Sequence, residues 1–193
     1  MSHEIIITNK ETMYYPVVEE GITWETERKG SPGKVTFKIY KDSVLNIEEG
    51  NSVSIKKDGQ NVFFGFIFTF KIDKEGFYNI TAYDQLRYFK NKDTYYYVNK
   101  KANEMLKELA VMFNLNVGIL DDTEYIIPKR LEEDKTLFDM VQNALDFTLQ
   151  NKKKIYVLYD DFGKLTLKNI ENMKINILID EETAENIDFL FIL

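Results

Sequence analysis

The side chains that most often carry catalysis are scarce in this sequence. It contains a single histidine, His3, and no cysteine. A hydrolase triad needs a nucleophile within hydrogen-bond reach of a base, and the one histidine lies near a terminus, where order is usually poor. A lone histidine also excludes an HExxH-type zinc site. The missing cysteines exclude disulfides and thiolate metal sites.

Paired carboxylates are the remaining catalytic candidates, because glycoside hydrolysis uses only two Asp or Glu residues. Each acidic run lies beside a turn signal or a helix start, where negative charge suits the surface and the helix dipole. Solvated turns are therefore the favoured interpretation, and Asp121-Asp122 lacks the spaced Asp or Asn ligands and the glycine of an EF-hand calcium loop. The runs are Glu48-Glu49, Asp121-Asp122, Glu132-Glu133-Asp134 and Asp180-Glu181-Glu182.

Two short motifs match known magnesium or phosphate sites but lack the surroundings that those sites need. Asp161-Phe162-Gly163 has the sequence of the kinase magnesium tripeptide, yet no glycine-rich loop, HRD or APE segment accompanies it. Its flanks predict a hairpin in which Gly163 takes the turn conformation. The Gly30-Ser31-Pro32-Gly33 turn has no GK[ST] ending and no following helix. We therefore expect no catalytic site, no metal and no cofactor.

An aromatic cluster offers a binding alternative. Tyr95-Tyr96-Tyr97, with Tyr88 and Phe89 upstream, would suit a sugar or a protein partner if it were exposed. Tyrosine can bury its ring while its hydroxyl stays hydrogen-bonded, so it also suits domain junctions. We favour packing of these rings between the two halves of the chain.

Composition and charge argue against two classes of partner. The chain of 193 residues has a net charge of −7 and a pI of about 4.9, so a phosphate backbone would be repelled. The densest basic stretch, Lys152-Lys153-Lys154, is best explained as a solvated turn. No apolar run approaches the roughly 20 residues of a membrane helix, and the N-terminus lacks a signal-peptide pattern. We expect neither a nucleic-acid nor a membrane partner.

The elements that position these residues divide at about residue 91, and the predicted fold class is α+β. Residues 1–90 have the pattern of an antiparallel β-barrel or sandwich domain. Lys34–Tyr40 alternates apolar and polar residues, which indicates one buried and one wet face. Asp58-Gly59 predicts a type I′ hairpin turn, because that turn needs positive φ at both central residues.

The strand after this turn, Asn61–Lys71, is apolar on both faces, as expected for a central or covered strand. We assign Phe64, Phe66 and Phe68 to the core. Gly65 predicts a bulge or a sharp bend of the kind that barrel corners require.

Residues 91–193 predict a small α/β domain with two amphipathic helices. Asp84 is placed to cap a short helix before it. Apolar residues spaced as on one helix face occur from Ala102 to Phe113, with Asn99 as the predicted cap, and again after Thr136.

Short strands complete this second part. A hairpin is expected to turn at Asp160–Gly163, and a further strand is expected over residues 175–179. A helical turn over 180–186 and an apolar end over 187–193 follow.

Six segments, taken in order, form a pattern that no single one of them establishes. They are Trp24 with Arg28, Gly30, Pro32 and Gly33; Glu49-Gly50; Asp58-Gly59 with Phe63-Phe64-Gly65-Phe66; Ala82–Tyr88, which holds Asp84 and Arg87; Asn91-Lys92-Asp93; and Leu158–Leu165, which holds Asp161 and Gly163. Together they resemble the XkdQ/YqbQ-like family of phage-like elements, which are hub proteins of contractile-tail baseplates. The similarity covers most of residues 20–175.

The resemblance implies a structural hub that links the tail tube to the central spike, with an N-terminal fold related to tail-tube proteins. Its partners would be tube, spike and baseplate proteins, met in the bacterial cytoplasm before the hub enters the tail. In this view the glycines form turns and Trp24 is a core anchor. Arg28, Asp84 and Arg87 are candidates for a polar bridge near the domain junction.

Members of this family continue past the position of Leu193, where this chain stops in an apolar run typical of a strand beginning. We expect either a truncated product or a short relative. A closed ring needs a repeated head-to-tail contact, so we expect a monomer or weak oligomer at this length and a trimer for a longer version.

Two alternatives remain from the residues alone. One is a tail-associated peptidoglycan hydrolase that uses two carboxylates. The other is a cell-surface glycan-binding module that uses exposed tyrosines at Tyr95–Tyr97.

Overall fold

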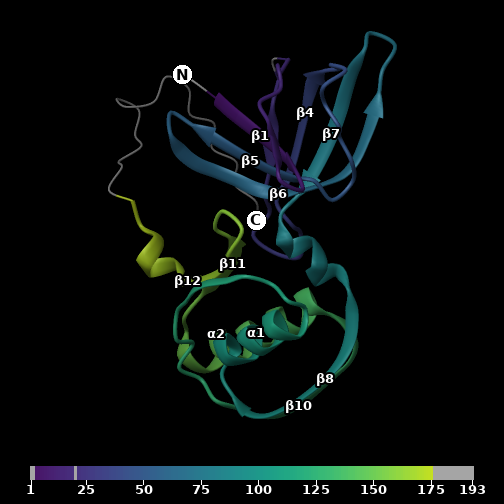
Figure 1. Cartoon of the computed structure of the whole chain (residues 1–193). Coiled ribbons are helices and arrows are strands. Elements are labelled where there is room, and N and C mark those ends of the chain that lie inside the picture. Colours follow the sequence, from purple (N-terminus) through teal and green to yellow (C-terminus); the bar gives the residue numbers. More distant parts are fainter. Residues whose placement is uncertain (1–2, 20, 176–193) are drawn as a thin grey trace, which may run out of the picture.

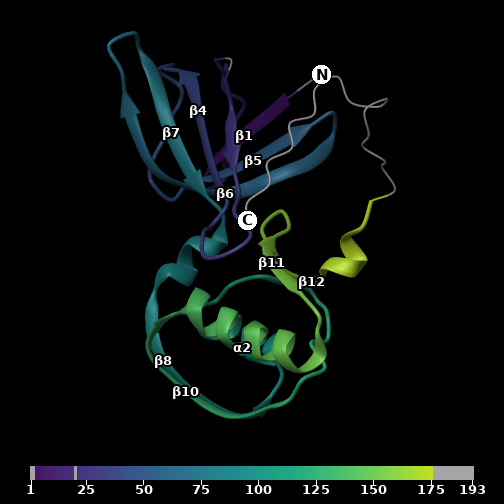
Figure 2. The same ribbon diagram turned by 180° about the vertical axis from the view of Figure 1, so that it is seen from behind.

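A computed structural model describes residues 3–19 and 21–175, and it shows a curved sheet above a layer of helices and strands (Figure 1). The same two parts are separated in the view from behind (Figure 2). The elements expected over 175–179, 180–186 and 187–193 reach beyond the described residues, and so does the acidic run Asp180-Glu181-Glu182. Within the described ranges no helix is long and apolar enough to cross a membrane.

The first part is a seven-stranded antiparallel sheet with the order β2-β1-β5-β6-β7-β4-β3. Its strands are β1 (His3–Asn9), β2 (Thr12–Tyr14), β3 (Thr23–Glu25), β4 (Lys34–Tyr40), β5 (Ser52–Lys57), β6 (Gln60–Ile72) and β7 (Phe77–Tyr83). Among the described residues the end strands β2 and β3 do not pair with each other, so the sheet is open and does not close into a barrel, while the expected antiparallel β-structure is confirmed. Both end strands are only three residues long, which leaves little edge for closure.

β6 buries the face opposite to the one we predicted. Phe63 and Ile67 are 4% and 2% exposed, whereas Phe66 and Phe68 are 37% and 47% exposed. Alternation identifies a strand but not its buried side when both faces are apolar. The register decides the matter, because Phe63 lies opposite the buried Ile55 and cross-strand partners share a face.

The turn chemistry of the sheet is largely as predicted. Asp58 and Gly59 have φ of 49° and 79°, which confirms positive φ at both central positions of the β5–β6 turn. The expected bulge at Gly65 is wrong, because the irregularities of pairing lie elsewhere. The pairing of β6 with β7 shifts between Ile67 and Thr69, and the pairing of β5 with β6 shifts between Ile55 and Lys56.

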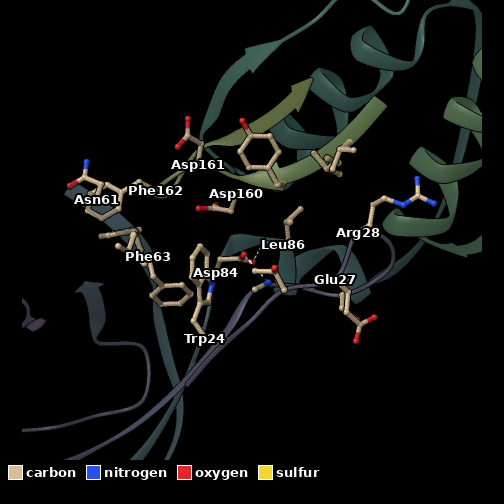
Figure 3. Close-up of a pocket in the computed structure, with 18 of the residues that line it drawn as sticks. Trp24, Glu27, Arg28, Asn61, Phe63, Asp84, Leu86, Asp160, Asp161 and Phe162 are labelled. Carbon is tan, nitrogen blue, oxygen red and sulfur yellow. Dashed lines mark hydrogen bonds between the residues drawn. The ribbon is translucent and has the colours of Figure 1, made fainter. Parts of the chain in front are cut away.

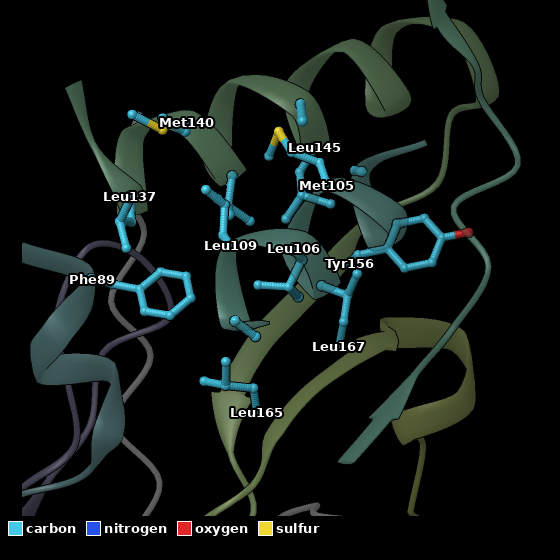
Figure 4. Close-up of a cluster of buried hydrophobic side chains, with 14 of the residues drawn as sticks. Phe89, Met105, Leu106, Leu109, Leu137, Met140, Leu145, Tyr156, Leu165 and Leu167 are labelled. Atoms are coloured by element: carbon cyan, nitrogen blue, oxygen red, sulfur yellow. The ribbon is translucent and has the colours of Figure 1, made fainter. Parts of the chain in front are cut away.

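The second part contains two helices and two small sheets. Its elements are η1 (Gln85–Lys90), β8 (Lys92–Lys100), α1 (Ala102–Met112), β9 (Val117–Leu120), β10 (Ile127–Thr136), α2 (Leu137–Lys152), β11 (Tyr156–Asp160), β12 (Leu165–Asn169) and η2 (Ile170–Met173). β8 pairs with β10, and β12 joins β11 to β9 with parallel pairing to β9. Both amphipathic helices are confirmed, and their apolar faces form the cluster in Figure 4.

The helix caps are partly as expected. The Thr136 hydroxyl accepts a hydrogen bond from Asp139 N at 3.0 Å, which confirms the cap of α2. The cap of α1 is Lys101, and the expectation of Asn99 is wrong because β8 continues through that residue to Lys100.

The tyrosine run does not pack between the two parts. It lies on β8, where Tyr97 is buried in the apolar cluster of the second part and Tyr95 stacks on it with ring centroids 5.6 Å apart. Tyr96 points to the other face and is 60% exposed. The period-2 alternation of a strand therefore separates the three rings.

Candidate functional site

Three segments from both parts of the chain meet around a cavity of about 550 Å³ (Figure 3). The segments are the β3–β4 loop, the start of η1 and the β11–β12 hairpin, and the near end of β6 closes one side. Of the residues singled out in the sequence, this site brings together Trp24, Arg28, Gly33, Asp84 and Asp161.

Asp84 is the structural centre of the site. It is 6% exposed, and its two carboxylate oxygens accept hydrogen bonds from Gly33 N at 2.8 Å and Leu86 N at 3.0 Å. The second bond confirms that Asp84 caps the short helix, which is the 3-10 helix η1. A Cβ at position 33 would lie 2.5 Å from Asp84 Oδ2, so only glycine admits the carboxylate there.

Asp160 approaches the cavity from the hairpin. Its Oδ1 accepts a hydrogen bond from Gly163 N at 2.6 Å, while its Oδ2 is buried without a hydrogen bond of good geometry. The backbone and side-chain amides of Gln85 lie near enough to lower the pKa of this carboxyl group, against the effect of burial. Gly163 has φ of 83°, which confirms its role in the turn. The Phe162 ring lies 5.7 Å from that of Phe64, so the tip of the hairpin packs on β6.

The two carboxyl groups face each other across the cavity in Figure 3. Burial raises the pKa of Asp84 to about 7, and the negative charge of Asp160 adds to this rise, while the amides of Gly33 and Leu86 oppose it. Burial also raises the pKa of Asp160. The pair therefore retains a proton at pH values where exposed aspartates are fully ionised.

The polar bridge predicted among Arg28, Asp84 and Arg87 does not form. Within the described part of the chain, no ion pair joins either arginine to Asp84. The Arg87 guanidinium instead lies 4.8 Å from the centre of the Phe68 ring on the outer face of β6. Arg28 points away from the carboxyl pair in Figure 3.

Trp24 is not a core anchor. It lies on the end strand β3, is 52% exposed and forms a wall of the cavity beside Asp84. The expectation is wrong because β3 is a three-residue strand at the end of the described sheet. A side chain on such an edge strand has a neighbouring strand on one side only, so its ring stays partly exposed. The ring remains accessible to anything that enters the cavity.

The other singled-out residues lie outside this site. Gly30 forms a turn with φ of 71°, and Pro32 is buried beside Gly33. Asp58-Gly59 forms the β5–β6 turn and does not line the cavity, and Gly65 serves a close contact within the sheet.

The acidic runs within the described residues lie mostly at the surface, as predicted, with one exception. Glu132 is 2% exposed on β10, where it accepts hydrogen bonds from Asn143 Nδ2 and Arg130 Nε. The run Glu132-Glu133-Asp134 therefore lies on a strand with a buried first residue, and the prediction of a solvated turn is wrong there. In the described ranges no three His, Cys, Asp or Glu side chains gather as a metal ion requires.

Sequence reasoning missed Asp160 as a partner of Asp84. Its only local signal is its position at the start of the hairpin turn, where an Asp side chain often accepts from the backbone. Nothing in the spacing shows that the hairpin reaches the first sheet, because that contact is set by tertiary packing.

The carboxyl pair predicts a pH-dependent stability. Both groups have raised pKa values in the folded chain, so their contribution is full below about pH 4 and is lost as the pH rises through about 7. Asp160→Asn removes one charge from the pair, so the Asp84 carboxylate no longer faces a second negative charge. We expect the variant to be more stable by about 1 kcal/mol at pH 8 and unchanged at pH 4.

Urea unfolding of both proteins at the two pH values measures this difference. Glu75→Gln, which removes a negative charge from an exposed loop away from the cavity, is the matched control and should leave the pH dependence nearly unchanged. Equal pH dependence in the Asp160→Asn variant and the original chain would contradict the coupling of the pair.

Sequence comparisons identify relatives over most of the chain. The model of the YQBQ-like family matches residues 22–190. YqbQ of Bacillus subtilis (strain 168) is 34% identical over 165 residues, which cover 82% of this chain and 50% of that protein. XkdQ of the phage-like element PBSX, from the same organism, is 28% identical with the same coverage. The chain thus spans about half the length of these relatives.

Solved structures share the fold. The 43 kDa tail protein of prophage MuSo2 from Shewanella oneidensis has a TM-score of 0.66 at 16% identity, covering 86% of this chain and 53% of that one. The E. coli c3393 protein, a type VI secretion component described as similar to the T4 tail proteins gp27 and gp5, has a TM-score of 0.61 at 11% identity and covers 86% and 48%. With the family match across residues 22–190, the chain belongs to the YQBQ-like family.

Proposed function

We propose that this chain is a structural, non-enzymatic component of a phage-like contractile tail, in the baseplate hub that joins the tail tube to the central spike. The observation that carries the proposal is the YQBQ-like match across residues 22–190 on a fold shared with tail proteins. The relative XkdQ belongs to a phage-like element, and c3393 is described as similar to gp27 and gp5.

We also propose that the chain comprises two domains, residues 1–90 and 91–193. Two separate clusters of buried side chains support this division, one with members from Ile5 to Ala82 and one with members from Leu86 to Leu167. The singled-out glycines and Asp84 then serve structure, since they shape turns and the junction between the clusters. The partners are the tube, spike and baseplate proteins, without nucleic acid or membrane, and the whole protein self-associates as a trimer.

In this proposal the protein assembles in the bacterial cytoplasm and then remains in the tail. The hydrolase alternative gains no support from the carboxyl pair, because Asp84 is 6% exposed and is held by two backbone amides. The glycan alternative gains none from the tyrosines, because Tyr97 is 1% exposed and only Tyr96 presents its ring.

An in-frame deletion in the phage-like element tests this role. We expect electron microscopy of induced lysates to show no complete tails, and a plasmid copy of the full-length gene should restore them. A cell-wall hydrolase would give a different result, since its loss would leave assembled tails that fail to kill. Complete tails in the deletion strain would contradict the structural role.

A further inference from the structure

We propose that the junction cavity binds the guanidinium group of an arginine side chain presented by a neighbouring tail protein. The cavity is lined by Trp24, Phe63, Asp84 and Asp160, and it has room for such a side chain at about 550 Å³. The identity of the partner rests on the proposed function, whereas the chemistry of the site rests on the cavity itself.

The cavity holds negative charge that a bound cation would neutralise. Two buried carboxyl groups face each other there, and no described residue forms an ion pair with either (Figure 3). Each Asp84 oxygen accepts one amide hydrogen bond and keeps a second acceptor position. Asp160 Oδ2 is buried and makes no hydrogen bond of good geometry, since the Gln85 amides only approach the carboxyl group, and a donor in the cavity would relieve this cost.

The other charged and titratable groups around the cavity do not supply this cation. Glu27 and Arg28 come from the β3–β4 loop, and in Figure 3 both point away from the carboxyl pair. Tyr159 and Asp161 come from the hairpin and add no positive charge. The lining residues from β6 and η2 are neutral.

The aromatic wall selects a planar cation. Trp24 stands beside Asp84 with its ring 52% exposed, and Phe63 forms the wall behind it. A guanidinium group can stack on an aromatic face while its N–H groups reach a carboxylate, and an ammonium group lacks this planar match. Arginine therefore fits both walls of the cavity better than lysine, whose ammonium group is attracted to the ring but cannot stack on it.

Binding should also depend on pH, because a cation displaces the proton that the carboxyl pair retains. The raised pKa of Asp84, about 7, places this competition near neutral pH. Affinity should therefore increase between pH 5.5 and pH 8.

Trp24 provides a site-specific readout, since it is the single tryptophan of the chain. We would titrate the purified chain with N-acetyl-arginine amide and follow tryptophan emission. We expect a saturable change in emission with the arginine ligand. The Kd of the citrulline analogue, which has the same shape without the charge, should be at least about tenfold higher. The lysine analogue should bind more weakly than arginine, and arginine should bind more tightly at pH 8 than at pH 5.5.

Variants test the assignment to the carboxyl pair. Asp160→Asn should weaken arginine binding by about tenfold or more, and far-UV circular dichroism establishes that the variant is folded. Glu75→Gln removes the same charge from an exposed loop away from the cavity and should bind like the original chain. Equal binding of citrulline, or full arginine binding by the Asp160→Asn variant, would overturn the proposal.

The assay uses the isolated chain, so its outcome is separate from that of the deletion experiment. Arginine binding by the chain, together with normal tails in the deletion strain, would refute the structural role but support the binding site. A tail defect without arginine binding would support the structural role and refute the binding site.

Discussion

Replacing Phe63 with alanine is expected to lower the free energy of unfolding by about 3–5 kcal/mol, because the ring is 4% exposed and its removal leaves a cavity in the sheet's core. The same change at Phe66 should cost about 1 kcal/mol or less, because that ring is 37% exposed and its loss removes one edge contact with Phe64. Urea unfolding followed by circular dichroism measures both values.

The two variants control for each other, since both remove a phenyl ring from β6 and they differ only in the face of the sheet. Similar costs at the two positions would mean that β6 is covered on both sides in solution. A larger cost at Phe66 would mean that the register of β6 against β5 is wrong.

Replacing Gly65 with alanine is expected to destabilise the chain by about 3 kcal/mol, because the new methyl group has no space. A Cβ there would lie 2.3 Å from the carbonyl oxygen of Tyr83 on β7 and 2.6 Å from the Phe63 ring. The first of these atoms is backbone within the sheet, so relief requires β6 and β7 to separate. The midpoint of urea unfolding reports the cost.

Gly59→Asn is the matched control for this change. Gly59 lies at the β5–β6 turn with nothing within 4 Å of a Cβ, and its φ of 79° is in the region that asparagine tolerates. We expect it to cost about 1 kcal/mol or less. A Gly65→Ala variant as stable as this control would show that β6 and β7 do not approach so closely.

Local sequence patterns predict the elements of this chain well, because turns and helix faces depend on nearby residues. The Asp58-Gly59 turn, the Thr136 cap and the apolar faces of α1 and α2 all follow from short-range chemistry. The α+β class and the YQBQ-like resemblance are confirmed as well.

Features set by distant contacts were not predictable in the same way. The buried side of β6 is fixed by its register against β5, since both of its faces are apolar. Trp24 is half exposed because β3 is an edge, which its own sequence does not reveal. The facing of Asp84 and Asp160 depends on a hairpin of the second part packing against the first sheet, and no spacing encodes that contact.

Cross-linking mass spectrometry of purified tail particles tests the central claim most directly. If this chain is a structural hub component, it should co-purify with intact particles, and exposed lysines such as Lys41 and Lys129 should cross-link to tube, spike or baseplate proteins. Intact particles that lack the chain, with all of it free in the lysate, would contradict the account.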